Sequence, residues 1–210
     1  MFSFLKVCCG IKPVHRYNVK DDTGKEVFSI LEDSECCDRS FCPGAHSFIM
    51  NVTDASNQVV IRMVRPFVCC CSRNKLEVQS PPGTAIGYVQ HNWHICLPKF
   101  TIENEQGEPA FKIEGPCIGC TCHTDHNFEL LSLNEAATER SFGTILKPVS
   151  SSGPNAGAGF VLRFPSNLDV KMKATVLGAC ILIDYMCYKS RNQPIWCTCL
   201  TLAIGCWKLY

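Results

Sequence analysis

Apolar and polar residues alternate along most of residues 17–113, and short runs of Asp, Asn, Ser and Gly separate the alternating segments. Alternation with a period of two is typical of strands that bury one face. Asn, Asp and Gly also tolerate the positive φ that tight hairpin turns need. The pattern therefore predicts strand pairs at 17–20 and 25–30, 48–53 and 59–64, 75–79 and 85–90, and 99–103 and 110–113.

Two later segments, 128–133 and 159–164, supply further strands, whereas residues 150–157 form a loop by composition. So many short antiparallel strands must close into a barrel or pair as a sandwich, because open sheet edges invite aggregation. The alternation alone leaves both architectures open.

A helix-compatible run, residues 168–188, follows Pro165, and its segment 174–183 is apolar nearly all round. Such a helix is buried in a protein core or in lipid. Its candidate buried residues are Ala174, Val176, Leu177, Ile181, Leu182 and Ile183. A spanning helix needs about 20 apolar residues, and Asp184 interrupts this run, so burial inside the β-domain is favoured over a membrane span.

The chain divides into a short N-terminal segment at 1–11, one domain at 12–190 and an apolar, Cys-rich tail at 191–210. Its length of 210 residues fits one ordinary domain. Within the tail, residues 195–207 are too few to span a bilayer and suit an interfacial segment.

Composition narrows the function classes. Hydrophobic residues make up 46% and charged residues 19%, which argues against disorder and against a multi-span membrane protein. A net charge of +1 gives no general electrostatic reason to bind nucleic acid. The 17 cysteines fall in clusters and the start lacks a secretory signal, so a reducing cytosolic setting fits better than a disulfide scaffold.

Three adjacent cysteines, Cys69, Cys70 and Cys71, lie among the basic residues Arg65, Arg73 and Lys75. Exposed thiols in such a setting can be S-acylated, and two or three acyl chains give stable membrane anchoring. Burial as small core residues and a metal-binding turn are the alternatives. Cys8 and Cys9 are weaker acylation candidates.

A second cysteine cluster offers ligands that zinc could use. It comprises Cys117, Cys120, Cys122, His123 and the nearby His126. Cys36, Cys37 and Cys42 could supply a second group only if the fold happened to bring them close. Structural zinc needs two ligand groups brought together by the fold, so reduced structural cysteines are favoured over metal.

Enzymatic chemistry has no support in the sequence. No Gly-rich phosphate loop, zinc-protease motif or nucleophile elbow occurs, so no catalytic residue is predicted. His91, Trp93 and His94 lie close together in sequence, and we interpret this cluster as packing rather than chemistry.

Several longer motifs resemble those of the phospholipid scramblase family. They are Pro-Pro-Gly at 81–83, Ile-Gly-Tyr-Val at 86–89, Trp93, Cys-Leu-Pro-Lys-Phe at 96–100, Ile-Glu-Asn-Glu at 102–105, Lys-Ile-Glu-Gly-Pro-Cys at 112–117 and Leu-Asp-Val-Lys-Met-Lys-Ala at 168–174. The resemblance runs from about Tyr17 to Ser190. It implies a mainly β, tubby-like fold, in which a closed antiparallel barrel of twelve strands surrounds a hydrophobic C-terminal helix.

The resemblance also implies an activity, namely ATP-independent, bidirectional, calcium-triggered movement of phospholipids between leaflets. It places the protein at the cytoplasmic face of the plasma membrane, with membrane phospholipids as partners, no nucleic acid, and palmitate on Cys69, Cys70 and Cys71. The loop that corresponds to the family's calcium site, residues 156–167, contains no carboxylate. Backbone carbonyls and Asn167 would bind Ca²⁺ weakly, because this hard cation prefers six to eight oxygens, several of them charged.

Two other functions compete with scrambling. One is a palmitoylated membrane adaptor or phosphoinositide-binding module, by analogy with tubby-like domains, which binds head groups without moving them. The other is a zinc-dependent structural protein, which would hold about one equivalent of metal.

Overall fold

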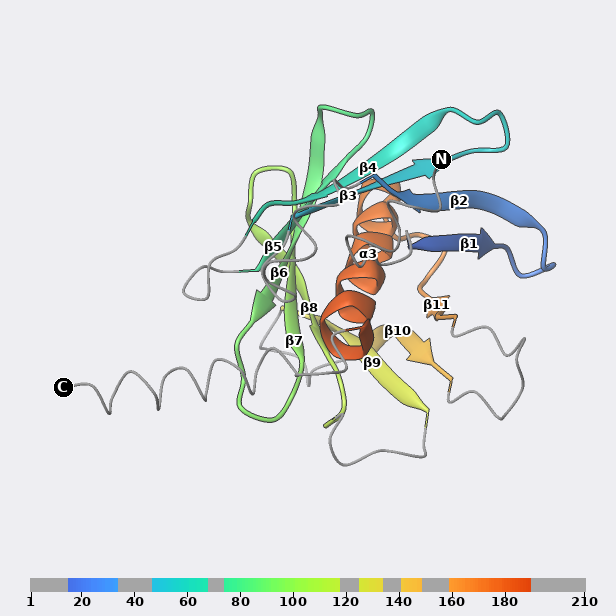
Figure 1. Cartoon of the computed structure of the whole chain (residues 1–210). Coiled ribbons are helices and arrows are strands. Elements are labelled where there is room, and N and C mark those ends of the chain that lie inside the picture. The colour runs from blue at the N-terminus through green and yellow to red at the C-terminus, as the bar shows by residue number, and fades with distance from the viewer. Residues whose placement is uncertain are drawn as a thin grey trace, which may run out of the picture.

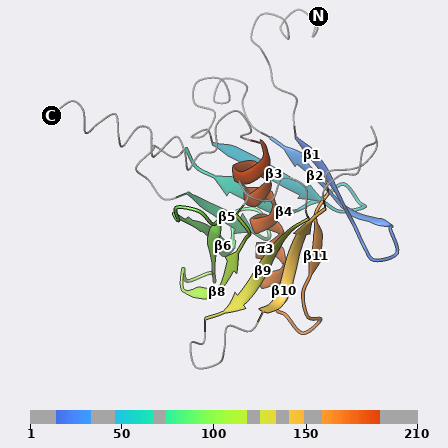
Figure 2. The same cartoon turned by 90° about the horizontal axis from the view of Figure 1, so that it is seen from below.

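The chain folds as one antiparallel sheet curled around a C-terminal helix (Figures 1 and 2). The computed structural model describes residues 15–33, 47–67, 74–117, 125–133, 141–148 and 159–189. Within them the sheet has eleven strands, and each strand pairs with its neighbours in sequence. The predicted mainly β fold with a single C-terminal helix is therefore confirmed for the described residues.

The predicted strand pairs correspond to neighbouring strands of this sheet. The strands are β1 (Arg16–Lys20), β2 (Glu26–Glu32), β3 (Phe48–Thr53), β4 (Val59–Arg65), β5 (Lys75–Gln79), β6 (Ala85–Asn92), β7 (Lys99–Glu103), β8 (Pro109–Glu114), β9 (His126–Ser132), β10 (Ser141–Lys147) and β11 (Val161–Arg163). The helix α3 (Val170–Ile183) continues directly into a π-helical segment, η1 (Asp184–Lys189). Together these two cover most of the predicted helical run 168–188.

Three of the hairpin turns share one construction. The side-chain oxygen of the first turn residue accepts the backbone N–H groups two and four positions later, at Asp21, Asp54 and Asn104. The fourth turn residue has a positive φ, at Gly24, Asn57 and Gly107. This is why Asp or Asn followed three residues later by Gly or Asn marked these turns in the sequence.

A register shift lies next to the turn in each of the hairpins β1–β2, β3–β4, β5–β6 and β7–β8. Such bulges increase the local right-handed twist of a strand pair. Their repetition along one side of the sheet favours the curl that lets the strands enclose the helix.

The residues predicted to be buried on the helix do lie in the protein core. Val176, Ile181, Leu182 and Ile183 are at most 3% exposed, and Ala174 and Leu177 are partly buried against the same core. They pack with inward-facing strand residues such as Val78, Val89 and Ile102. The apolar helix therefore fills the inside of the sheet.

No helix in the described parts of the chain is both long enough and apolar enough to cross a membrane.

Two glycines let the helix approach the sheet closely. A Cβ on Gly87 in β6 would lie 2.5 Å from Thr175 Oγ1 and 2.9 Å from the backbone oxygen of Glu103. A Cβ on Gly178 of the helix would lie 2.7 Å from Val78 Cγ2. At these two positions the backbone of one element therefore lies directly against side chains of the other.

The sheet does not close among the described residues, and β1 and β11 are its two edge strands. The closed barrel of twelve strands is therefore not confirmed. The strand pattern of the sequence also missed β10, in which only Ile145 is buried and a register shift lies between Ser141 and Gly143. A strand with one buried residue and a bulge lacks the alternation on which strand prediction relies.

We expect Gly87→Ala to destabilise the fold by about 1–3 kcal/mol, because the added methyl group overpacks the contact between β6 and α3. Two of the three nearest atoms belong to Thr175, so Thr175→Ala in the same chain should recover part of the loss. Denaturant unfolding of the wild type, both single variants and the double variant measures this. An unchanged midpoint for Gly87→Ala would contradict the close approach.

Candidate functional site

A buried carboxylate lies where α3 ends. Asp184 caps the helix C-terminus, its backbone N–H donates to the carbonyl oxygens of Cys180 and Ile181, and the residue is only 4% exposed. The helical backbone continues past Asp184 into η1, so this carboxylate lies within a helical run and is held against the core. A buried charge in this position requires cationic or hydrogen-bonding partners.

Asp184 finds such partners on strands from opposite ends of the sheet order. The hydroxyl of Tyr17 in β1 donates to its Oδ2 at 2.8 Å. The ammonium of Lys147 in β10 donates to its Oδ1 at 3.0 Å. Because β1 is one edge strand and β10 pairs with the other, the carboxylate links the two edges of the sheet. We call Tyr17, Asp184 and Lys147 the seam triad.

Aromatic rings enclose the cation of this triad. The Nζ atom of Lys147 lies 4.1 Å from the ring centre of Phe160 and 4.6 Å from that of Tyr188. The hydroxyl oxygen of Tyr188 is 2.6 Å from His126 Nδ1, and the two rings are stacked. A cation over aromatic faces within 6 Å is stabilised by the ring quadrupole, and more strongly when it is desolvated.

The buried charge of Asp184 also acts on neighbouring acids. Burial, and then the Asp184 carboxylate, raise the pKa of the Tyr17 hydroxyl far above its ordinary value. The same causes raise the pKa of Cys187 to about 12, and they raise that of Cys180 as well. Both cysteines therefore remain neutral thiols near pH 7, and a neutral thiol is a poor nucleophile and a poor metal ligand.

More buried charge lies at the same end of the core. Arg65 at the end of β4 is 0% exposed, donates to Asn74 Oδ1 at 2.6 Å, and lies over the ring of Tyr185 at 4.9 Å. Glu32 at the end of β2 is also buried and accepts the backbone N–H of His15 at 3.2 Å. Ionic groups thus gather around the C-terminal end of the helix.

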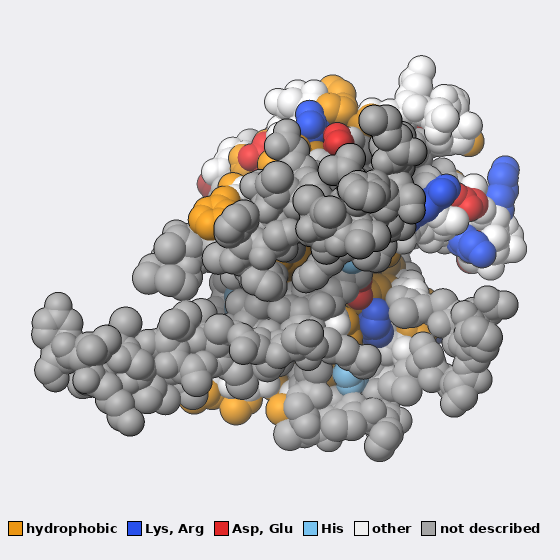
Figure 3. All heavy atoms as spheres, in the orientation of Figure 1, with side chains coloured by type: hydrophobic (Ala, Val, Ile, Leu, Met, Phe, Trp, Pro, Cys, Tyr) orange, Lys and Arg blue, Asp and Glu red, His pale blue; other side chains and the backbone are white. Residues whose placement is uncertain are grey.

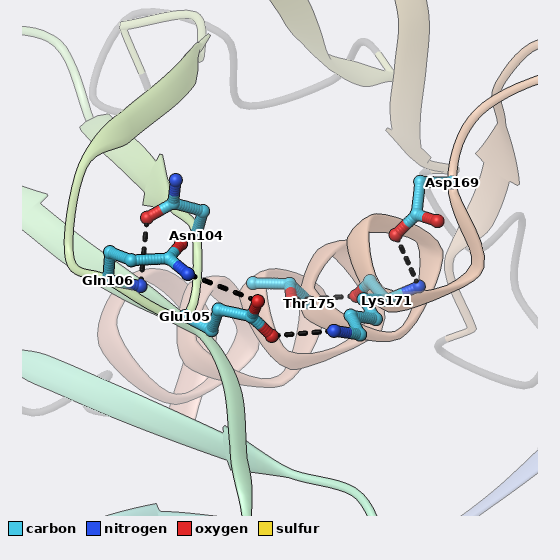
Figure 4. A network of polar contacts seen from close by, with 6 residues as sticks. All are labelled: Asn104, Glu105, Gln106, Asp169, Lys171 and Thr175. Atoms are coloured by element: carbon cyan, nitrogen blue, oxygen red, sulfur yellow. Dashed lines mark hydrogen bonds and ion pairs between the residues drawn. The ribbon is translucent and has the colours of Figure 1, made fainter.

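The opposite end of the helix is organised differently (Figure 4). There the Asp169 side chain accepts the backbone N–H of Lys171, and Lys171 Nζ pairs with Glu105 Oε2 at 2.6 Å. The side chains of this pair are 52% and 40% exposed, against 12% and 6% for Lys147 and Asp184. Figure 3 likewise shows basic and acidic side chains gathered on the surface over the β1–β2 hairpin. Of these two ion pairs, the one between Lys147 and Asp184 is therefore the desolvated one.

The predicted lipidation residues Cys69, Cys70 and Cys71 lie outside the described residues, in the connection between β4 and β5. Of the predicted calcium loop, Asn167 is described and is exposed in the turn before α3. Within the described parts of the chain, no group of three or more His, Cys, Asp or Glu residues is arranged to hold a metal ion.

The zinc candidates are described only in part. Cys117 is a partly buried cysteine, and His126 contacts Tyr188. The other candidates lie outside the described residues, namely Cys36, Cys37, Cys42, Cys120, Cys122 and His123, as do Cys8, Cys9 and the tail 191–210.

The structure separates the three members of the predicted aromatic and histidine cluster. His91 packs its ring against Phe100 at 5.3 Å, whereas the Trp93 side chain is exposed. His94 Nδ1 accepts the backbone N–H groups of Cys96 and Leu97. Packing and loop capping account for the two histidines.

Few features of the sequence indicated the seam triad. Asp184 was noted only as an interruption of the apolar run, and Tyr17 and Lys147 stood out in no motif. A charged residue inside an otherwise apolar helix is the signal that could have indicated a buried partner.

Comparison with known proteins identifies the family. The sequence profile described as Scramblase matches residues 1–190. The chain belongs to the scramblase family. It is 40% identical over 198 residues to human "Phospholipid scramblase 1", covering 90% of this chain and 61% of that protein. The corresponding values for bovine "Phospholipid scramblase 2" are 38% over 194 residues, 88% and 65%.

A shorter relative of the scramblase family, human "Phospholipid scramblase family member 5", is 36% identical over 194 residues, which cover 88% of this chain and 70% of that protein. The chain spans about three fifths of the length of the phospholipid scramblases 1 that it matches. No solved structure matches it.

We expect acid to weaken this scramblase-family fold partly through His91, because burial lowers the pKa of its imidazole from 6.5 to about 4. The unfolded chain takes up a proton near pH 6.5 that the folded chain resists, so this contribution is complete above pH 6.5 and is lost as the pH falls. The loss reaches up to roughly 3 kcal/mol at pH 4.

Denaturant unfolding of the wild type and His91→Gln at pH 7.5 and pH 5 isolates this effect. The stability difference between the two proteins should shrink at pH 5, because only the wild type loses the histidine contribution. An equal difference at both pH values would show that His91 titrates normally in the folded chain.

Proposed function

We propose that the chain moves phospholipids between the leaflets of a membrane, in both directions and without ATP. The observation that carries this proposal is the match of the scramblase profile to residues 1–190. Relatives named phospholipid scramblase at 35–40% identity support the same activity. The protein would then act as a lipid translocator rather than as an enzyme that makes or breaks bonds.

One end of the sheet is suited to face the membrane. Strands β4, β6 and β10 run in the same direction and end there, as the helix does. Phe67 after β4, and Trp93 and Ile95 after β6, are 62%, 60% and 68% exposed. Large apolar and aromatic side chains of this kind partition into the membrane interface.

Lipidation would strengthen that attachment. The connection that carries Cys69, Cys70 and Cys71 leaves β4 at the same end of the sheet. We propose that these cysteines carry palmitate and that the protein works at the cytoplasmic face of the plasma membrane. Several acyl chains together with inserted apolar side chains would give stable binding where a single chain is marginal.

The lipid route in this proposal follows the surface of the domain. Because α3 fills the space inside the sheet, a head group has no passage through the core of the described residues. Near the edge strands β1 and β11, the seam triad places polar groups in the core between β1 and β10. We therefore place head-group movement along the seam between these edge strands.

Calcium fits this chain poorly. The loop 156–167 has no carboxylate, Asn167 is exposed, and Arg163 at the end of β11 adds positive charge nearby. We propose that scrambling by this protein depends on calcium only weakly, because Ca²⁺ sites need several charged oxygens.

A membrane adaptor or phosphoinositide-binding module is the second candidate. The filled interior favours it, because a sheet packed around an apolar helix offers no internal lipid path. An adaptor would bind membranes or head groups and leave the lipid distribution across the bilayer unchanged.

We expect the purified full chain, reconstituted into vesicles labelled on one leaflet, to equilibrate the label between leaflets without ATP. Added millimolar calcium should change the rate little. The variant Cys69→Ala/Cys70→Ala/Cys71→Ala should bind vesicles more weakly when the protein is produced in cells that palmitoylate it. Membrane binding by the wild type without any flip, with or without calcium, would instead favour the adaptor.

A further inference from the structure

We infer that the ion pair of Lys147 and Asp184, together with the rings of Phe160 and Tyr188, is a binding site for a zwitterionic phospholipid head group. The ammonium of the head group would take the position of the Lys147 ammonium beside Asp184, and its phosphate would pair with Lys147. This inference rests on the proposed function and names the group that recognises the lipid.

The opposite charges of Lys147 and Asp184 determine which kind of ligand could replace their ion pair. The side chains of Lys147 and Asp184 are only 12% and 6% exposed. Opening a buried ion pair is strongly unfavourable when one charge is left without a partner. A purely cationic or purely anionic ligand would satisfy one member and leave the other unpaired. A zwitterion satisfies both, so it can replace the pair without leaving an uncompensated charge.

The aromatic rings favour a choline-type cation. Phe160 and Tyr188 already hold an ammonium group at 4.1 and 4.6 Å from their ring centres, within reach of the Asp184 carboxylate. Aromatic faces combined with negative charge are the groups that recognise quaternary ammonium ligands. The displaced lysine carries a compact charge on a flexible stem, and such a group pairs readily with phosphate.

The position of the pair also suits an exchange with lipid. Lys147 is the last residue of β10, and Asp184 begins η1, at the end of the sheet where Phe67 and Trp93 are exposed. The pair joins β10 to the helix, and through Tyr17 the same Asp184 carboxylate is also bonded to β1. A head group that opened it would therefore loosen the seam along which we place lipid movement.

A second ion pair in the chain provides a matched control. Lys75 pairs with Glu103 at 2.7 Å and lies 4.1 Å from the ring centre of Tyr88. This pair joins β5 and β7 in the middle of the sheet, and the Lys75 side chain is 38% exposed. It has a lysine, a carboxylate and a ring, but it lacks the burial and the position at the sheet edges.

The test is calorimetric titration of the purified full chain with glycerophosphocholine, and in separate runs with choline chloride and with inorganic phosphate. We expect saturable binding of glycerophosphocholine that is at least tenfold tighter than that of either single ion. The double variant Lys147→Met/Asp184→Asn should lose it by at least tenfold, and Lys75→Met/Glu103→Gln should retain it.

The double variant is used because it removes both charges and leaves neither one unpaired, and circular dichroism shows whether it is folded. If it does not fold, the single-ion titrations of the wild type still decide the matter. No saturable binding to the wild type, equally tight binding of choline alone, or equal losses in both double variants would overturn the inference.

Vesicle flip measured on the same variants separates this inference from the proposed function. Glycerophosphocholine binding without flip by the wild type would support the site and contradict the scramblase activity. Flip that is unchanged in a folded Lys147→Met/Asp184→Asn protein would contradict the site and leave the scramblase activity standing. Loss of flip in that variant, with normal flip in the control, would support both.

Discussion

The buried negative charge of Asp184 is the constraint that determines how the two ends of the sheet order are held to the helix. Desolvating a carboxylate costs several kcal/mol unless partners surround it. The partners come from β1 and β10, at opposite ends of the sheet order. One carboxylate thus links the helix to β1 and to β10, in a sheet that does not close among the described strands.

The position of the helix also bears on how the protein could contact a membrane. The helix that looks membrane-like by composition is the core of the domain. In the function that we propose, contact with lipid would therefore fall to the exposed apolar residues at the sheet end and to the seam triad. A buried ion pair adds little net stability over an apolar replacement, but it is sensitive to anything that supplies an alternative partner.

The sequence was enough to predict the hairpin turns and the buried helix, but not the contacts between residues far apart in the chain. The Asp and Asn turns that end in Gly24, Asn57 and Gly107 carry their own backbone geometry, so their hairpins could be predicted. The apolar helix could be predicted too, because its composition requires burial. The seam triad could not, since Tyr17 and Lys147 are 167 and 37 residues from Asp184 and lie in strands with no charge motif. Strand β10, which carries Lys147, was itself missed because its alternation is weak.

A double-mutant cycle between Tyr17→Phe and Lys147→Met, read by denaturant unfolding, tests most directly whether Asp184 links the two edges. Both residues bond to the same carboxylate, so their effects on the free energy of unfolding should be coupled by more than about 0.5 kcal/mol. The coupling should fall when Asp184 is changed to Asn. Additive effects of Tyr17→Phe and Lys147→Met would contradict the account, because the two sheet edges would then be held independently.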